Sequence, residues 1–441
     1  MMNFKKYKRV PVLDYPNREW PDKEIKKAPA WCSVDLRDGN QALIDPMTVD
    51  EKIEMFQLLL KLGFKEIEIG FPAASQIEYD FLRKLVEENM IPDDVTVQVL
   101  TQCREHLIDR TFEAIEGIKN VIVHIYNSTS VLQRDVVFHM DKEAIKQIAI
   151  DGTNMVKERM KNCEGNITLE YSPESFTGTE MEFALDICSA VQKTWDHAND
   201  NKIIFNLPAT VEMTTPNVYA DQIEWMNKHF EDRDNIILSV HPHNDRGTGV
   251  AATELALLAG ADRVEGTLFG NGERTGNVDI LTLAYNMFSQ GINPGLELGD
   301  INEIREVYER CCKMKVGMRH PYAGKLVFTA FSGSHQDAIN SQSGKGGVAF
   351  VMDAAYGYKL PKEMQREFAD VIQKISEKQG EVSPSTIMDK FREEYLDAEE
   401  PFAFIRAKVE EPEEEGETRV TLRFRYKGEE MLAEAEGNGP I

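Results

Sequence analysis

The sequence predicts an α/β protein: a (β/α)8 TIM barrel, then a small helical C-terminal subdomain and the start of a truncated further domain. Eight short β-rich runs alternate with longer amphipathic segments between residues 31 and 268. With its last helix, this alternation fills roughly 260 residues, the expected size of one such barrel. After about residue 295 the rhythm changes to helical patterns. A doubly wound open sheet usually has fewer strands, so the barrel is favoured.

The eight runs are rich in β-branched residues and are bounded by polar turns. They cover residues 31–36, 65–70, 95–101, 120–126, 166–171, 202–207, 235–241 and 262–268. The intervening segments have apolar residues at helical spacing. In residues 49–62, for example, Ile53, Phe56, Leu59 and Leu60 share one face, which predicts a helix packed on a core.

Four regions follow from these patterns. Residues 1–30 are a polar, proline-punctuated N-terminal arm, residues 31–325 the barrel, residues 326–400 a helical linker subdomain, and residues 401–441 a second linker subdomain that opens a further domain. Helices are expected over 300–312, 361–378 and 383–394, the last capped by Ser383.

The chain's end predicts a hairpin. Residues 410–417 are an acidic linker, residues 418–426 alternate as a strand, and residues 429–436 could return after a turn at Lys427 and Gly428. An isolated two-stranded hairpin is barely stable in water. We therefore expect the natural chain to continue beyond Ile441.

Composition excludes several classes of protein. The 441 residues carry 50 basic and 75 acidic side chains, a formal net charge of −25, which argues against a nucleic-acid partner. A few local arginines can still attract a small anion into a cleft.

No apolar run approaches the ~18 residues of a membrane span, and no signal peptide is visible. The six cysteines form no C-x-x-C pair, and adjacent Cys311 and Cys312 are expected as reduced thiols on a helix. We expect a cytoplasmic protein.

The sharpest chemical signal is His241-Pro242-His243 at the end of the seventh run. Two imidazoles two residues apart point to the same side of a strand and suit a divalent metal. An isolated H-x-H is more often one packed and one solvated histidine. At the C-terminal end of a barrel strand, where active sites lie, the metal interpretation is favoured. Asp38, after the first strand, supplies a hard oxygen ligand, although Asp38-Gly39 is also a common turn. Arg37 beside it could hold a carboxylate or an oxyanion.

Two glycine-rich segments need separate interpretations. Residues 270–277 (GNGERTGN) lack the spacing of a dinucleotide fingerprint, but such a turn before a helix N-terminus can hold a phosphate, and Arg274 adds charge. Asn277 could add an oxygen to the metal. Residues 343–347 (SGKGG) do not form a Walker A loop and are interpreted as a flexible turn.

Six motifs in order resemble one family. LRDGNQ (36–41), GFPAAS (70–75), SPESFTGTE (172–180), NLPATVE (206–212), HPHNDRGTG (241–249) and GNGERTGN (270–277) are similar to those of the alpha-isopropylmalate (2-isopropylmalate) synthases. LRDG and HxHND alone would indicate only the wider family of Claisen-type synthases and lyases. NLPATVE and FSGSHQDAIN (331–340) narrow the resemblance to the longer branch.

The resemblance implies that acetyl-CoA condenses with 3-methyl-2-oxobutanoate and that water releases CoA, leaving 2-isopropylmalate, the first committed step of leucine biosynthesis. It implies that the metal ligands are Asp38, His241, His243 and Asn277, and that the catalytic residues are Arg37, Glu174 and His335. The implied substrate-binding residues are Leu100, His124, Tyr126, Ser172 and Thr210. The residues implied to lie near acetyl-CoA are Gly270, Gly272, Arg274 and Gly276.

The resemblance also implies partners and ions. The metal would be zinc, magnesium or manganese, with K⁺ as an activator. A homodimer is expected, because His335 matches a histidine that reaches the partner subunit's active site. Leucine would be a feedback inhibitor of the full-length protein. The alternatives are a homocitrate or citramalate synthase that uses another 2-oxoacid, and a non-catalytic remnant.

One departure from the family pattern motivates the remnant alternative. Family members usually carry a few dozen residues, including a proline-rich loop and a catalytic tyrosine, where Ile339 here runs directly into Asn340. We expect the natural chain to contain that segment.

Overall fold

The computed structural model describes residues 10, 12–199, 201–327, 345–379, 382, 384–397, 401–410 and 418–437. The chain divides into two compact units, Met1–Gly324 and Lys325–Ile441. The boundaries expected for the arm, barrel and linker subdomains stay a prediction at the level of single residues.

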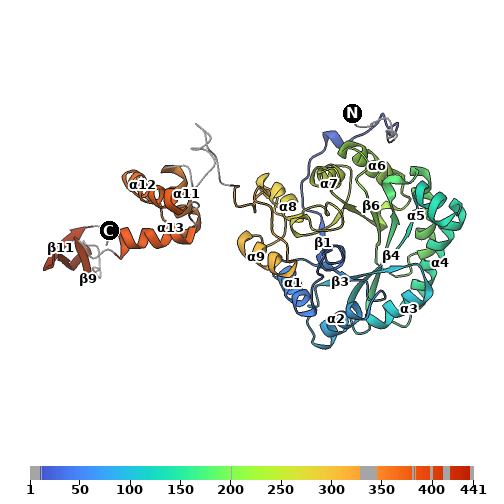
Figure 1. The fold of residues 1–441 in the computed structure, drawn as a ribbon, viewed down its shortest axis with the longest axis horizontal. Helices are drawn as coiled ribbons and strands as arrows, with labels where there is room; N and C mark the ends of the chain where they lie inside the picture. The colour runs from blue at the N-terminus through green and yellow to red at the C-terminus, as the bar shows by residue number, and fades with distance from the viewer. Residues whose placement is uncertain are drawn as a thin grey trace. The chain divides into compact units, whose positions relative to one another are not determined.

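The first unit is a closed eight-stranded parallel barrel (Figure 1), so the predicted fold class is confirmed. Its strands pair in chain order and β1 closes onto β8: β1 Ala30–Ser33, β2 Glu66–Gly70, β3 Thr96–Gln102, β4 Asn120–Ser128, β5 Asn166–Glu174, β6 Ile203–Ala209, β7 Ile236–Pro242 and β8 Arg263–Gly266. Each boundary lies within three residues of the predicted run.

Helices surround the barrel, as Figure 1 shows. They are α1 Val49–Lys61, α2 Gln76–Glu87, α3 Glu105–Ala114, α4 Lys142–Met160, α5 Met181–Trp195, α6 Pro216–His229, α7 Gly249–Leu258, α8 Ile280–Ser289 and α9 Ile301–Cys311. Short 3-10 turns lie at Trp20–Asp22, Phe176–Gly178, Arg233–Asn235 and Leu268–Gly270. A capping box formed by Thr48 and Glu51 starts α1, because the two side chains satisfy backbone N–H groups that the helix leaves free.

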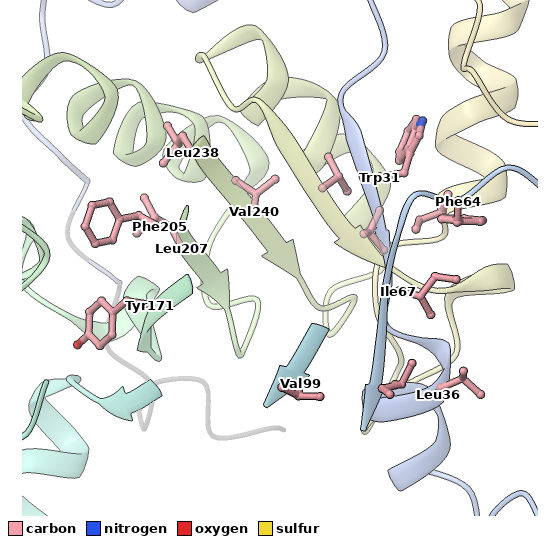
Figure 2. Close-up of a cluster of buried hydrophobic side chains, with 14 of the residues drawn as sticks. Trp31, Leu36, Phe64, Ile67, Val99, Tyr171, Phe205, Leu207, Leu238 and Val240 are labelled. Atoms are coloured by element: carbon pink, nitrogen blue, oxygen red, sulfur yellow. The ribbon is translucent and has the colours of Figure 1, made fainter. Parts of the chain in front are cut away.

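The strands bury both faces, with different residues on each. Phe205, Leu207, Leu238 and Val240 are fully buried and belong to the main hydrophobic cluster, part of which Figure 2 shows between strands and helices. Tyr171 meets the Phe205 ring edge-on, with centroids 6.5 Å apart. The residues between these apolar positions are polar and form the barrel's interior. This period-2 alternation of apolar and polar positions is what directs chemistry into the barrel.

The prediction for the first strand is wrong at its end. β1 stops at Ser33, and Asp35–Gly39 form a π-helical turn instead of continuing to Leu36. The buried Asp35 carboxylate accepts the Leu268 backbone N–H at 3.0 Å and the Ser33 hydroxyl at 2.8 Å. These bonds pull the chain out of the extended conformation, so that Arg37 and Asp38 follow on a tight turn.

The second unit has its own small core. Helices α11 Lys345–Tyr356, α12 Lys362–Gln379 and α13 Pro384–Phe391 bury a cluster around Met352, Phe368 and Phe391, followed by the π-turn Arg392–Leu396. The interpretation of residues 343–347 as a flexible turn is wrong from Lys345 onward, since α11 begins there. The predicted cap Ser383, the junction of Ile339 with Asn340 and the acidic residues 411–417 lie outside the described residues.

The expected hairpin is part of a three-stranded antiparallel sheet. β10 Thr418–Tyr426 pairs with β11 Glu429–Gly437 and also with β9 Phe402–Glu410, in the order β11-β10-β9. β9 was not predicted. Its sequence, FAFIRAKVE, alternates less cleanly than that of β10, which hides the strand pattern.

The cysteines and the described helices bear on two further expectations. All six cysteines are free, and Cys311 and Cys312 are buried at the end of α9. Among the helices that the structure describes, none is long and apolar enough to span a membrane.

Candidate active site

A cavity of about 280 Å³ opens among residues from the C-terminal ends of the barrel strands. Ten residues predicted for the site line it: Arg37, Asp38, Leu100, His124, Tyr126, Ser172, Glu174, Thr210, His241 and His243. They come from six different strands or the loops that follow them. The barrel therefore brings together residues that are up to about 200 positions apart in the chain, as its geometry requires.

Three side chains at one end of the cavity form a candidate metal site. One atom from each of Asp38, His241 and His243 lies within 4.8 Å of the others, and all three residues are buried. The Asp38 Oδ2 atom is 3.1 Å from His241 Nε2 and 3.6 Å from His243 Nε2. Asn277 Oδ1 is 2.9 Å from His241 Nε2, so the fourth predicted ligand faces the same point.

Two buried atoms of this group have no hydrogen-bond partner among the described residues: Asp38 Oδ1 and His243 Nδ1. A buried polar atom left unpaired is costly. Carboxylate and imidazole are ligands of first-row divalent metals. The residues present therefore fit a divalent ion.

The pKa shifts of these three side chains also favour a bound cation. Burial raises the pKa of Asp38, but Arg37 and His241 outweigh it and hold that pKa well below its usual range, so the carboxyl is ionised. Burial lowers the pKa of His241, whereas Asp38 and Glu265 raise it to about 9. The negative potential that favours a proton there favours a metal cation equally. Burial and the neighbouring His241 lower the pKa of His243 to about 4, which leaves its lone pair available.

Arg37 lies over the same end of the cavity on the π-turn. Its Nε donates to Glu68 Oε2 at 2.5 Å and its Nη1 is 3.5 Å from Asp38 Oδ2. Burial opposes the charge, but Glu68 and Asp38 raise the pKa of the guanidinium well above its ordinary value. A fixed cation thus faces the position where an oxygen ligand of the metal would lie.

The middle of the cavity has one apolar and several polar walls. Leu100 and Tyr126 lie on β3 and β4, and His124 is two residues before Tyr126, so these side chains face inward together. His124 Nε2 is 2.7 Å from the Ser172 hydroxyl, and the Tyr126 hydroxyl accepts from the Gln102 amide at 3.1 Å. Each polar group is fixed by a neighbour, so the pocket is preformed.

Glu174 and Thr210 lie at the outer rim. The Glu174 carboxylate accepts a hydrogen bond from the Ser128 hydroxyl, and Thr210 Oγ1 accepts the Ser175 backbone N–H at 2.9 Å. These bonds connect the ends of β4, β5 and β6 and hold both side chains at the cavity.

The glycine-rich loop shapes the metal end. Gly276, at φ +96°, packs so tightly that a Cβ would lie 1.9 Å from the Gly270 carbonyl oxygen. A Cβ on Gly272, at φ +157°, would lie 2.2 Å from Asn277 Nδ2. The Gly270 carbonyl accepts the Asn277 backbone N–H at 3.1 Å. All three glycines therefore position Asn277.

The anion site expected at the following helix is not free. Asp279 caps α8 through the Leu281 N–H, so a carboxylate already occupies that N-terminus. Arg274 donates to Asp245 at 2.7 Å and to the Thr210 carbonyl, and its side chain is about a third exposed (37%). A role of this loop toward acetyl-CoA stays a prediction, as does that of His335, which lies outside the described residues.

Sequence reasoning missed two groups of residues. Gln41, Phe71, Asn206, Pro208 and Glu273 complete the cavity wall. Below it, the barrel interior holds Glu68, Gln98, Glu170, Arg263 and Glu265, all fully buried. A usable signal was present: charged residues at alternate positions inside runs such as KEIEIG and DRVEG are rare in buried strands unless they are paired.

This fold and site define a (β/α)8-barrel enzyme with a candidate divalent-metal centre at the strand ends. The sequence matches the HMGL-like family over residues 28–307. A 2-isopropylmalate synthase of Clostridium acetobutylicum is 53% identical over 100% of this chain and 87% of its own length. One of Rhizobium johnstonii is 52% identical over 99% of this chain and 85% of its own length.

Solved structures show the same fold. The hydroxymethylglutaryl-CoA lyase of Pseudomonas aeruginosa has a TM-score of 0.54 at 17% identity, covering 67% of this chain and 97% of that one. The HMG-CoA lyase of Brucella melitensis has a TM-score of 0.52 at 15% identity, covering 65% of this chain and 100% of that one. The chain belongs to the 2-isopropylmalate synthase family, within the HMGL-like proteins.

Proposed function

We propose that this chain is an acyltransferase that condenses acetyl-CoA with 3-methyl-2-oxobutanoate to give 2-isopropylmalate and CoA, the first committed step of leucine biosynthesis. The observation that carries the proposal is the convergence of Asp38, His241 and His243 with the Arg37 guanidinium at one end of a cavity, in a chain 53% identical to a 2-isopropylmalate synthase.

A divalent ion held by Asp38, His241, His243 and Asn277 would supply Lewis acidity toward a carbonyl oxygen. Zinc, magnesium and manganese are the candidates, with K⁺ as an activator. The oxoacid would bind with its keto group at this end and its carboxylate toward Thr210. Its branched alkyl group would lie against Leu100, His124, Tyr126 and Ser172.

The reaction balances as follows. The methyl group of acetyl-CoA loses a proton, and the resulting carbanion forms a C–C bond with the keto carbon. The keto oxygen takes the electron pair and then a proton, and water cleaves the thioester to release CoA. Arg37 stabilises the negative charge on that oxygen, since it is a buried, fixed cation.

The methyl group is a weak carbon acid, so a positioned base is needed. Glu174 lines the cavity and is held by Ser128, which supports a role in organising proton transfer. His335, by its family match, would complete the acid–base machinery from the partner subunit. Gly270, Gly272, Arg274 and Gly276 would lie toward acetyl-CoA.

A homodimer, a cytoplasmic location and feedback inhibition by leucine in the full-length protein complete the proposal. Large apolar side chains are exposed after β4, including Leu132 at 70% and Val137 at 62%, which supports burial against another subunit. Sedimentation that gives a monomer mass at micromolar concentration would contradict the dimer.

The function is tested by CoA release with Mn²⁺ or Mg²⁺ and three oxoacids. We expect 3-methyl-2-oxobutanoate to be preferred over pyruvate and 2-oxoglutarate. Preference for pyruvate or 2-oxoglutarate would instead identify a citramalate or homocitrate synthase. No release with any of the three would support the remnant alternative.

A further inference from the structure

A layer of polar side chains lies inside the barrel directly beneath the metal end of the cavity. Glu265 and Arg263 come from β8, Glu170 from β5, Gln98 from β3 and Asn206 from β6, and each is at most 1% exposed. Ionisable groups so deeply buried are costly unless neighbours satisfy them. The two glutamates of this layer differ: one is surrounded by hydrogen-bond donors and the other is not.

Glu265 is surrounded by donors. Its Oε1 atom accepts from the Arg263 guanidinium and the Gln98 amide, each at 2.8 Å. Its Oε2 atom is 2.8 Å from His241 Nδ1 and accepts from the Asn206 amide at 3.1 Å. Four hydrogen bonds, one from a buried guanidinium, fix both the position and the negative charge of this carboxylate.

The contact with His241 sets which nitrogen faces the metal site. With Nδ1–H donated to Glu265, the Nε2 atom points toward Asp38 and Asn277, at 3.1 and 2.9 Å. A carboxylate behind a metal-binding imidazole holds the tautomer and raises the basicity of the other nitrogen. Since β7 and β8 are paired neighbours, the backbone holds this geometry as well.

Glu170 has no such donors. Neither of its carboxyl oxygens accepts a hydrogen bond from any donor in the described ranges. The nearest cationic or imidazole nitrogens, Arg263 Nη1 and His124 Nε2, are each 3.4 Å away, and Arg263 Nη1 already serves Glu265 and Ser239. An ionised carboxylate in this position would have only the shared Arg263 charge, and no hydrogen bond, to offset its burial.

Burial and the adjacent Glu265 charge raise the pKa of Glu170 well above its ordinary value. A protonated carboxyl can donate a hydrogen bond to a neighbouring carboxylate, whereas two ionised carboxylates would repel each other. The geometry and the charge balance therefore agree on one ionised and one neutral glutamate.

We propose that Glu265 is a positioning residue that orients the metal ligand His241 through its Nδ1–H, and that Glu170 beside it acts as a neutral hydrogen-bonding neighbour rather than a second charge. The inference deepens the proposed function and rests on its metal-ligand assignment. It predicts that metal affinity falls in Glu265→Gln and is kept in Glu170→Gln, although the two substitutions are chemically identical and the two side chains lie close together.

The test measures Mn²⁺ binding by calorimetry on the whole chain, with no substrate present, for wild type, Glu265→Gln and Glu170→Gln. Glutamine in place of Glu265 loses the charge and offers an amide to Nδ1, so we expect Mn²⁺ affinity to fall 10–100-fold, the usual effect of removing such a partner. Glutamine in place of Glu170 matches the neutral carboxyl in shape, so affinity should stay within about twofold.

A readout that a purely structural role would not change is the ¹⁵N NMR spectrum of the histidine side chains, assigned with His241→Asn. In the wild type loaded with Zn²⁺, His241 should carry its proton on Nδ1. A proton on Nε2 would overturn the proposal, and this result does not depend on whether Glu265→Gln folds.

The remaining outcomes distinguish a failure of the metal-ligand assignment from a failure of the positioning role of Glu265. If the wild type binds no Mn²⁺, the metal assignment of the proposed function fails. If the wild type binds Mn²⁺ and Glu265→Gln binds it equally well, only the positioning role fails. A second bound Mn²⁺ that is lost in Glu170→Gln would show that His124, Glu170 and Glu265, whose ligand atoms also lie within 4.8 Å of one another, hold an ion instead.

Discussion

Polar side chains at the mouth of the barrel and in its interior differ in their hydrogen-bond partners. At the mouth, Asp38 Oδ1 and His243 Nδ1 are buried and unpaired among the described residues, and Arg37 faces the cavity. In the interior, Glu265 and Arg263 are saturated by one another and by amides. The unpaired groups at the mouth mark where a cation would bind, and the saturated Glu265 carboxylate positions one of its ligands. The unpaired interior carboxyl, Glu170, is the one that stays neutral.

Removing a ligand at the mouth should have the largest effect. His241→Ala deletes an imidazole that contacts Asp38, Asn277 and Glu265, so metal content should fall to background and turnover should be abolished. Elemental analysis and CoA release measure both. His197→Ala, at an exposed histidine paired with Asp232, is the control. Full metal occupancy in folded His241→Ala would refute the ligand assignment.

Arg37→Lys should separate charge from geometry at the mouth. Lysine keeps the positive charge but cannot make the guanidinium's contacts with both Glu68 and Asp38. We expect turnover to fall by about 10²–10³-fold with metal content unchanged. Arg310→Lys, in the exposed pair with Glu54, should leave turnover unaffected. Equal activity of Arg37→Lys and wild type would show that Arg37 does not stabilise the developing charge.

A fully buried acid behind the mouth should control the pH dependence of stability. Burial raises the pKa of Asp35 to about 7, above its unfolded value of about 3.8. The folded state therefore holds the proton more tightly, and wild-type stability should fall as pH rises from about 4 to about 7, by ~4 kcal/mol. Asp35→Asn should remove that decline, as thermal unfolding between pH 4.5 and 8 would show. An unchanged slope in the variant would mean that Asp35 ionises normally.

The glycine-rich loop offers the smallest effect. Gly276→Ala combines φ +96° with a clash against the Gly270 carbonyl oxygen, so it should cost ~2 kcal/mol of stability or more and weaken Mn²⁺ binding through Asn277. Gly291→Ala also has a positive φ, +77°, but open space around it, so it should cost about 1 kcal/mol and leave Mn²⁺ binding unchanged. Equal behaviour of the two variants would show that the loop does not position Asn277.

The sequence predicted the barrel because strand runs and amphipathic helices alternate with little interruption, and it predicted the mouth because polar residues follow those runs. It did not predict the interior. Glu170 lies in NITLEY, where one glutamate among apolar residues resembles a strand end, and only the closed barrel shows that it faces Arg263 and Glu265. The π-turn after Ser33 was missed for a similar reason, since it depends on Asp35 bonding Leu268, more than 200 residues away.

The most direct test of the division between mouth and interior is the anomalous X-ray scattering of a crystal of the whole chain soaked with Mn²⁺. We expect one strong peak within bonding distance of Asp38, His241 and His243, and none between His124, Glu170 and Glu265. A peak in the interior cluster, or no peak at the mouth at full Mn²⁺ occupancy, would contradict it.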